Sequence, residues 1–216
     1  MKGKCYLCNQ TFSKAGMTKH LRTHLKNDGD TKLFHIMVDG LYEPQYWLHI
    51  EIKANAKLKD LDQFLRDLWL ECCGHLSAFE IGGVSYHSDY FDFDLDPTAK
   101  DMNVPVNKVL NPGMEFYHIY DFGSSTELRL KVLGERKGKA KEKVRILARN
   151  NPPEKACGCG EKAKWVCTQC FVDNLGENCY FCEKCAKEHE CGEEMLLPVV
   201  NSPRSGVCGF EGGKYD

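Results

Sequence analysis

The sequence predicts an α+β fold, in which a β-grasp-like antiparallel sheet carries one packed helix and is flanked by small zinc-binding modules. Three observations predict it. Short segments from Lys32 onward alternate between apolar and polar residues. One segment between them has apolar residues at helical spacing. Nine of the 13 cysteines lie in the last sixty residues, mostly in close pairs.

The alternating segments supply the expected strands. FHIMV and YWLHIEIK flank a turn-rich stretch, and SAFEIGGVSYHS, MEFYHIYDFG and STELRLKVLGE follow later in the chain. Between the two groups, LKDLDQFLRDLWLECC has one apolar face, and Gly74 is placed to stop the helix. We therefore expect the helix to pack across one face of the sheet.

Composition shifts divide the chain into four expected parts. Basic residues outnumber acidic ones near the N-terminus and again after residue 134, whereas the middle of the chain is acidic. The parts are a zinc finger at 1–30, an α+β domain at 31–136, a basic linker at 137–155, and a cysteine-rich cross-brace zinc module with a Pro/Gly-rich tail at 156–216.

The cysteines favour zinc over disulfides. The N-terminal MKGKCYLC lacks the apolar core of a signal peptide and no long apolar run is present, so we expect a cytoplasmic protein with reduced thiols. An odd number of cysteines also prevents complete pairing within one chain. Zinc is therefore the expected cofactor.

The first 24 residues resemble a two-Cys, two-His zinc finger, although eleven residues rather than twelve separate the cysteine pair from the histidine pair. Phe12 and Met17 stand where such a finger needs its apolar core. The expected ligands are Cys5, Cys8, His20 and His24.

The helix of this finger is a poor reader of DNA bases, because the positions that would contact bases hold Ser13, Ala15, Gly16 and Lys19. Contact with nucleic-acid phosphates, or docking onto a protein, fits its composition better. The candidate phosphate-binding residues are Lys14, Lys19, Arg22 and Lys26.

The C-terminal module resembles B-box and related cross-brace domains, in which the first and third ligand pairs bind one zinc and the second and fourth pairs bind the other. Cys208 is an alternative to Cys191 as the last ligand, Cys179 is expected to be a spare thiol, and Cys72 and Cys73 are expected to be core residues or incidental. With the finger, the chain is expected to hold three zinc ions. The eight ligands expected here are Cys157, Cys159, Cys167, Cys170, Cys182, Cys185, His189 and Cys191.

EPQYWLHIEI, GHLSAFEIGG and YHIYDFG are similar to a family named for the third open reading frame of the root-inducing plasmid pRiA, from about Leu33 to Arg136. The resemblance implies a fold rather than an activity, and an association with mobile elements. His75 and Asp121 match its motifs and would form a polar site or serve structurally. The Asp and two later motif residues that commonly follow YDFG are replaced by Ser124, Thr126 and Leu128.

The stretch SDYFDFDLDPTAKD places five aspartates in one expected loop at 89–101. The Gly and Glu of a calcium-binding loop are missing, so a solvated acidic loop is favoured over a docking site for a basic protein segment or a metal site.

Together these features favour a zinc-dependent binding or adaptor protein without catalysis, contacting protein partners and, through its basic arms, DNA or RNA phosphates. Neither a membrane partner nor a small-molecule substrate is expected. The alternative is a metal-dependent nuclease or other enzyme of a mobile element or defence system, using His75, Asp121 and the acidic loop.

Overall fold

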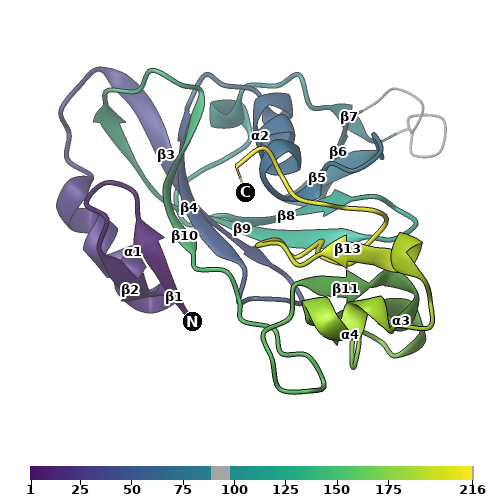
Figure 1. Ribbon diagram of the computed structural model, residues 1–216. Helices are drawn as coiled ribbons and strands as arrows, with labels where there is room; N and C mark the ends of the chain where they lie inside the picture. The colour runs from purple at the N-terminus through teal and green to yellow at the C-terminus, as the bar shows by residue number, and fades with distance from the viewer. Residues whose placement is uncertain (89–97, 216) are drawn as a thin grey trace. The chain divides into compact units, whose positions relative to one another are not determined.

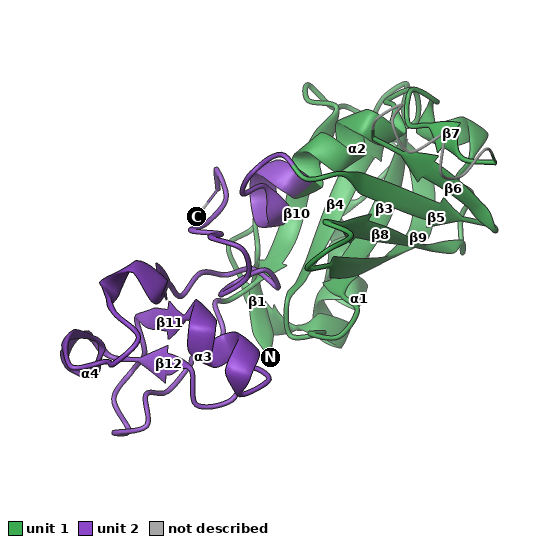
Figure 2. Ribbon diagram, turned by 90° about the vertical axis from the view of Figure 1, so that its right-hand side faces the viewer, with its two compact units in different colours: residues 1–65, 75–151 green, residues 66–74, 152–216 purple. Residues whose placement is uncertain are grey.

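The computed structural model describes residues 1–88 and 98–215 and divides the chain into two compact units (Figures 1 and 2). The first unit contains residues 1–65 and 75–151, and the second contains residues 66–74 and 152–216. The acidic residues Asp89, Asp92, Asp94 and Asp96 of the expected loop lie outside the described residues.

The first unit is built on a ten-stranded sheet with the order β2-β1-β10-β4-β3-β9-β8-β5-β6-β7. Neighbouring strands run antiparallel except β6 and β7, which are parallel, so the sheet is mixed. Its strands are β1 (Lys2–Cys5), β2 (Thr11–Ser13), β3 (Thr31–Gly40), β4 (Trp47–Lys53), β5 (Ser77–Ile81), β6 (Val84–His87), β7 (Lys100–Asp101), β8 (Glu115–Tyr120), β9 (Thr126–Gly138) and β10 (Val144–Asn150).

Strand β4 shows why the sheet holds together. Six of its seven residues are buried, so both faces are covered, and it pairs with β3 on one side and β10 on the other. Strand β3 pairs in turn with β9 along its whole length, with a bulge between His35 and Ile36. The alternating segment that predicted this strand therefore lies in the interior of the sheet, where its polar residues His49 and Glu51 are buried as well.

The main helix of the first unit is α2 (Leu58–Leu65), which buries Leu58, Leu61, Phe64 and Leu65. Its one buried acid, Asp62, accepts hydrogen bonds from the Ser77 hydroxyl at 2.6 Å and from the His118 imidazole at 2.8 Å. These bonds satisfy a carboxylate that would otherwise be costly to bury. The α+β class predicted from the sequence is confirmed.

The N-terminal finger forms part of this sheet, because β1 pairs with β10 from Gly3–Asn150 to Cys5–Ala148. Helix α1 (Lys14–His24) follows β2, and its buried Met17 and Leu21 share a core cluster with Trp47. Phe12 packs against the same cluster, so the predicted apolar core of the finger is confirmed.

The stretch 137–155 was predicted to be a basic linker, but residues 144–150 of it form β10, an inner strand. Its charges hid the strand pattern. Arg145 and Arg136 both bind the buried carboxylate of Glu51, with Arg145 Nε at 3.0 Å and Arg136 Nη2 at 3.0 Å. Burial raises the pKa of Glu51, but the bonds from the two guanidinium groups outweigh it and lower that pKa overall.

The second unit contains the π-helical segment η1 (Arg66–Leu70) and a three-stranded sheet in the order β12-β11-β13. Val166, Cys179 and Leu197 form an apolar core cluster within it. Its remaining elements are β11 (Trp165–Cys167), α3 (Thr168–Asp173), β12 (Tyr180–Phe181), α4 (Glu183–Lys187), η4 (Glu193–Met195) and β13 (Leu196–Pro198). No helix among the described residues is long and apolar enough to span a bilayer.

Candidate metal centres

The structure gathers Cys/His side chains into four groups, and each group could hold a metal ion. Within each group the candidate ligand atoms all lie within 4.8 Å of one another. None of the thirteen cysteines, all within the described residues, forms a disulfide. Three of the four groups contain the twelve residues selected from the sequence.

The finger group consists of Cys5, Cys8, His20 and His24. Cys8 Sγ lies 3.2 Å from His20 Nε2, which lies 3.1 Å from His24 Nε2. The two cysteines lie in a tight turn that ends at Asn9, which adopts a φ of +62° and whose amide donates to the Cys5 carbonyl.

The finger has one residue fewer than usual between its cysteine pair and its histidine pair, and the start of α1 accommodates this difference. Ser13 caps the helix, and its hydroxyl accepts from the Gly16 amide at 3.2 Å, so the helix begins directly after β2. His20 and His24 then lie one turn apart on the same helical face. The Phe12 ring stacks on His20 with 4.1 Å between ring centroids, which holds the imidazole in place.

In the C-terminal module, the first and third pairs come together as Cys157, Cys159, Cys182 and Cys185. Cys159 Sγ and Cys182 Sγ are 3.7 Å apart. Backbone N–H groups, with that of Cys159 the strongest, lower the pKa of the Cys157 thiol to about 6. Hydrogen bonds with the side chains of Cys157 and Cys182 raise the pKa of the Cys185 thiol to about 12, because they favour its protonated form.

The second and fourth pairs come together as Cys167, Cys170, His189 and Cys191. Cys170 Sγ lies 3.4 Å from His189 Nε2 and 3.8 Å from Cys191 Sγ. The amide of Cys170 also donates to Cys167 Sγ at 3.4 Å. The pairs therefore alternate between two groups, as in the cross-brace arrangement that the spacing predicted.

The structure also shows which of Cys191 and Cys208 joins the cross-brace, a choice that the sequence left open. Cys191 joins the second group of the cross-brace, whereas Cys208 does not. Cys179 is fully buried in the apolar core of the second unit and donates to the Gly176 carbonyl at 3.2 Å. It belongs to none of the four groups.

Sequence reasoning missed the fourth group, which consists of Cys72, Cys73, His75 and Cys208. The prediction that Cys72 and Cys73 are core residues or incidental does not account for this grouping. The signal in the sequence was weak, because two adjacent cysteines and a histidine two residues later match no familiar spacing and the fourth member lies 133 residues further on.

The residues that match the YDFG and HLxxF motifs do come together. Asp121 Oδ2 lies 3.6 Å from His75 Nε2, and Asp121 Oδ1 accepts from the amides of Gly123 and Ser124 at 3.0 and 3.2 Å. Asp121 adopts a φ of +65°. Its carboxylate therefore holds a tight turn after β8, a structural use of the residue.

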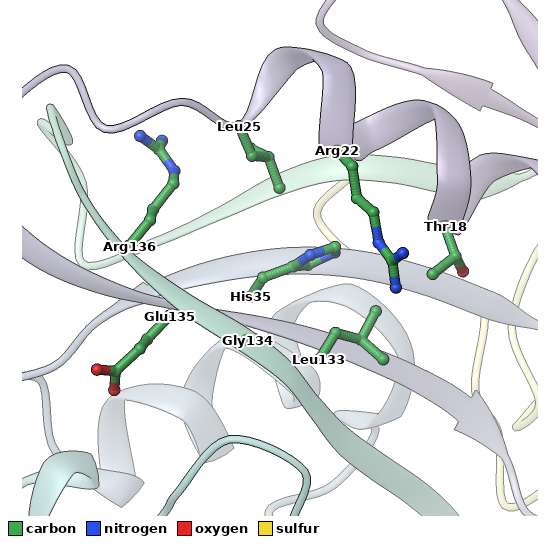
Figure 3. Close-up of a pocket in the computed structure, with 8 residues that line it drawn as sticks. All are labelled: Thr18, Arg22, Leu25, His35, Leu133, Gly134, Glu135 and Arg136. Carbon is green, nitrogen blue, oxygen red and sulfur yellow. The ribbon is translucent and has the colours of Figure 1, made fainter.

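The four candidate phosphate-binding residues have different surroundings. Lys19, Arg22 and Lys26 are exposed, whereas Lys14 forms an ion pair with the buried Asp39. Arg22 reaches from α1 over a pocket of about 160 Å³ that it shares with Thr18, His35 and Arg136 (Figure 3). Lys19 and Arg22 are three residues apart and so lie on one face of the helix.

The fold and the side chains together define a class of protein: an α+β domain with Cys/His groups at both ends of the chain. The chain belongs to the plasmid pRiA4b ORF-3-like protein family, whose sequence profile matches residues 32–167. The match covers the body of the sheet and ends at Cys167, so it includes three of the eight cross-brace ligands.

Comparison with solved structures finds a crystal structure described as a protein of unknown function, MM3350 from Methanosarcina mazei Go1. It is 17% identical, with a TM-score of 0.46, and the similarity covers 55% of this chain and 68% of that one. No curated protein matches the chain.

Proposed function

We propose that this protein is a zinc-dependent binding protein, in which three zinc ions hold the finger and the cross-brace module in shape. The observation that carries the proposal is the sorting of twelve Cys and His residues into three groups of four. Sulfur and imidazole nitrogen are the ligands of tetrahedral zinc, and four protein ligands leave no position for a catalytic water. The zinc at these sites is therefore structural.

Zinc supplies folding free energy where the apolar core is small. The core cluster next to the cross-brace ligands has three buried residues, Val166, Cys179 and Leu197, which is a small core for the residues that it orders. Binding of zinc to such a module contributes on the order of 10 to 16 kcal/mol per site at neutral pH. The finger depends less on its metal, because β1 is part of the large sheet.

The proposed binding target of α1 is the phosphate backbone of a nucleic acid. Lys19 and Arg22 share one exposed helical face, and Lys26 follows just beyond the helix. Such a surface binds phosphates without reading bases. Lys14 is not part of this surface, because Asp39 neutralises its charge.

The proposed protein contact uses the C-terminal module. Val172 and Leu175, three residues apart at the end of α3, expose 71% and 93% of their surface. Substituting both by Ser should weaken capture of a partner protein without changing zinc content. Equal recovery by wild type and variant would exclude this surface.

Zinc per chain measured by native mass spectrometry tests the metal part of the proposal. The zinc-loaded protein should hold at least three ions, and a chelator should unfold the C-terminal module. A protein that retains one zinc or none after reconstitution under reducing conditions would contradict the proposal.

Binding of labelled duplex DNA and RNA at several salt concentrations tests the nucleic-acid part. The slope of log affinity against log salt should approach about −0.9 per duplex phosphate neutralised. Changing Lys19, Arg22 and Lys26 together to Ala should make that slope shallower, by up to about 0.9 for each of the three phosphate contacts that are lost. The matched control removes three exposed lysines elsewhere: Lys59, Lys100 and Lys108. Absent or salt-independent binding would leave protein contact as the proposed function.

A further inference from the structure

We propose that Cys72, Cys73 and Cys208 hold a fourth zinc ion, which ties the segment after η1 to the C-terminal tail; the inference extends the zinc-dependent function proposed above. All three cysteines belong to the second unit. Their Sγ atoms lie within 4.8 Å of one another.

The sulfur separations fit a shared metal. Cys73 Sγ lies 3.4 Å from Cys72 Sγ and 3.7 Å from Cys208 Sγ. Two thiolates on one tetrahedral zinc, each about 2.3 Å from the metal, stand about 3.8 Å apart. The cross-brace groups show the same separations, 3.7 and 3.8 Å. A disulfide would need about 2.05 Å.

The backbone at the site is arranged to present these sulfurs. Cys208 adopts a φ of +49°, a conformation that residues with a side chain rarely take. Gly74, between Cys73 and His75, has a φ of +74°. The turns therefore point side chains that are distant in sequence toward one place.

Contacts that need no metal already hold the two segments together. The Ser202 hydroxyl donates to the Trp69 carbonyl at 2.7 Å, and the Lys214 amide donates to the Asp67 carbonyl at 2.7 Å. A Cβ built on Gly213 would lie 2.2 Å from the Leu68 carbonyl oxygen, so the tail passes directly over η1. The ligand set is thus preorganised within the second unit.

Arg204 supplies a positive charge next to the thiolates of the proposed site. Zinc bound by three thiolates carries a net charge of −1. The Arg204 side chain is fully buried, and its Nη2 donates to Cys72 Sγ at 3.4 Å. A buried cation bonded to a ligand sulfur favours the thiolate that zinc needs and orients it.

The partial exposure of this group makes it testable apart from the other three. Cys73 and Cys208 are exposed, whereas Cys72 is half-buried. Protein depleted of part of its zinc under reducing conditions should alkylate at Cys73 and Cys208, and stoichiometric zinc should suppress the reaction at both. Cys179, buried and outside all four groups, reports unfolding of the zinc-dependent module, so the reaction at Cys73 and Cys208 is compared while Cys179 stays protected.

Native mass spectrometry of the whole chain supplies the second measurement. Wild type should bind four zinc ions, and the Cys73→Ser/Cys208→Ser variant three, while Cys179→Ala retains four. Three ions in wild type with no change in the double variant, or alkylation unaffected by zinc, would overturn the fourth site and leave the three-zinc function standing. Wild type that binds none would overturn both.

Discussion

The Lys14 side chain on α1 forms an ion pair with Asp39, a fully buried carboxylate at the end of β3. Arg129 on β9 binds the same carboxylate, with its Nη2 2.9 Å from Asp39 Oδ2. The finger helix is thus fastened to the body by a charge that the body buries. A lysine that looked free to bind phosphate in the sequence serves a structural contact instead.

Replacing Lys14 by Met should lower the free energy of unfolding by about 1 to 3 kcal/mol, because the buried carboxylate loses one of its two cations. Chemical denaturation followed by tryptophan fluorescence measures the change. Lys19→Met, which removes an exposed lysine from the same helix, should have little effect. Equal stability of both variants would show that the ion pair does not hold the helix.

The close approach of Gly3 to the body gives a second prediction. A Cβ at Gly3 would lie 2.4 Å from the Arg149 carbonyl and 2.6 Å from the buried Trp47 ring. Gly3→Ala should therefore destabilise the first unit by roughly 1 to 3 kcal/mol through overpacking. Gly134→Ala is the matched control, because nothing lies within 4 Å of its Cβ position. Similar melting temperatures for the two variants would contradict the packing of β1 against Trp47.

Two buried histidines predict how stability depends on pH. Burial lowers the pKa of His35 to about 4 and that of His49 to about 3. Arg22 and Arg136 lower the first further while Glu51 raises it, and His35 and Lys14 lower the second. Both imidazoles are neutral in the folded state at pH values where the unfolded chain, with a pKa near 6.5, already binds protons.

Stability should therefore fall as the pH drops from about 6.5 toward 4, with each histidine adding up to about 1.4 kcal/mol per pH unit to the slope. The His35→Gln/His49→Gln variant should show a shallower dependence in urea titrations over that range. The comparison between the two proteins cancels the contribution of the Cys/His groups. An unchanged slope would mean that these histidines accept protons in the folded protein.

The cross-brace predicts a local response to loss of ligands. Changing Cys182 and Cys185 to Ser should unfold most of residues 157–200, because interleaved pairs leave neither site independent of the other. The large sheet should persist, since it has its own core. Hydrogen exchange with mass spectrometry would locate the change, and retained protection of β11 and α4 would show that the ligands are wrongly assigned.

Asp121 separates a binding protein from the nuclease alternative. Asp121→Ala should lower thermal stability because the amides of Gly123 and Ser124 lose their acceptor, and Asp121→Asn should retain most of it. Metal-dependent cleavage of labelled DNA or RNA that disappears in Asp121→Ala but not in a variant of equal stability would favour the enzyme.

The sequence by itself determined the local metal-binding parts and the fold class. In the finger and the cross-brace, the ligands of each pair are at most four residues apart, so a turn or a single helical turn places them together whatever the rest of the chain does. The strands β3 and β4 were predictable for a similar reason, because the alternation of apolar residues along each segment does not depend on which strand pairs with it.

The tertiary structure alone decided which distant segments meet. Residues 144–150 form an inner strand rather than a linker because of Glu51, a residue far away in sequence. Its carboxylate binds Arg145 and so makes a basic stretch compatible with the sheet. The grouping of Cys208 with Cys72 and Cys73 depended on the tail returning to η1. The spacing of two ligands in a pair is a property of the local backbone. The pairing of β10 with β4 and the return of the tail to η1 depend instead on contacts between residues more than ninety positions apart, which no local pattern encodes.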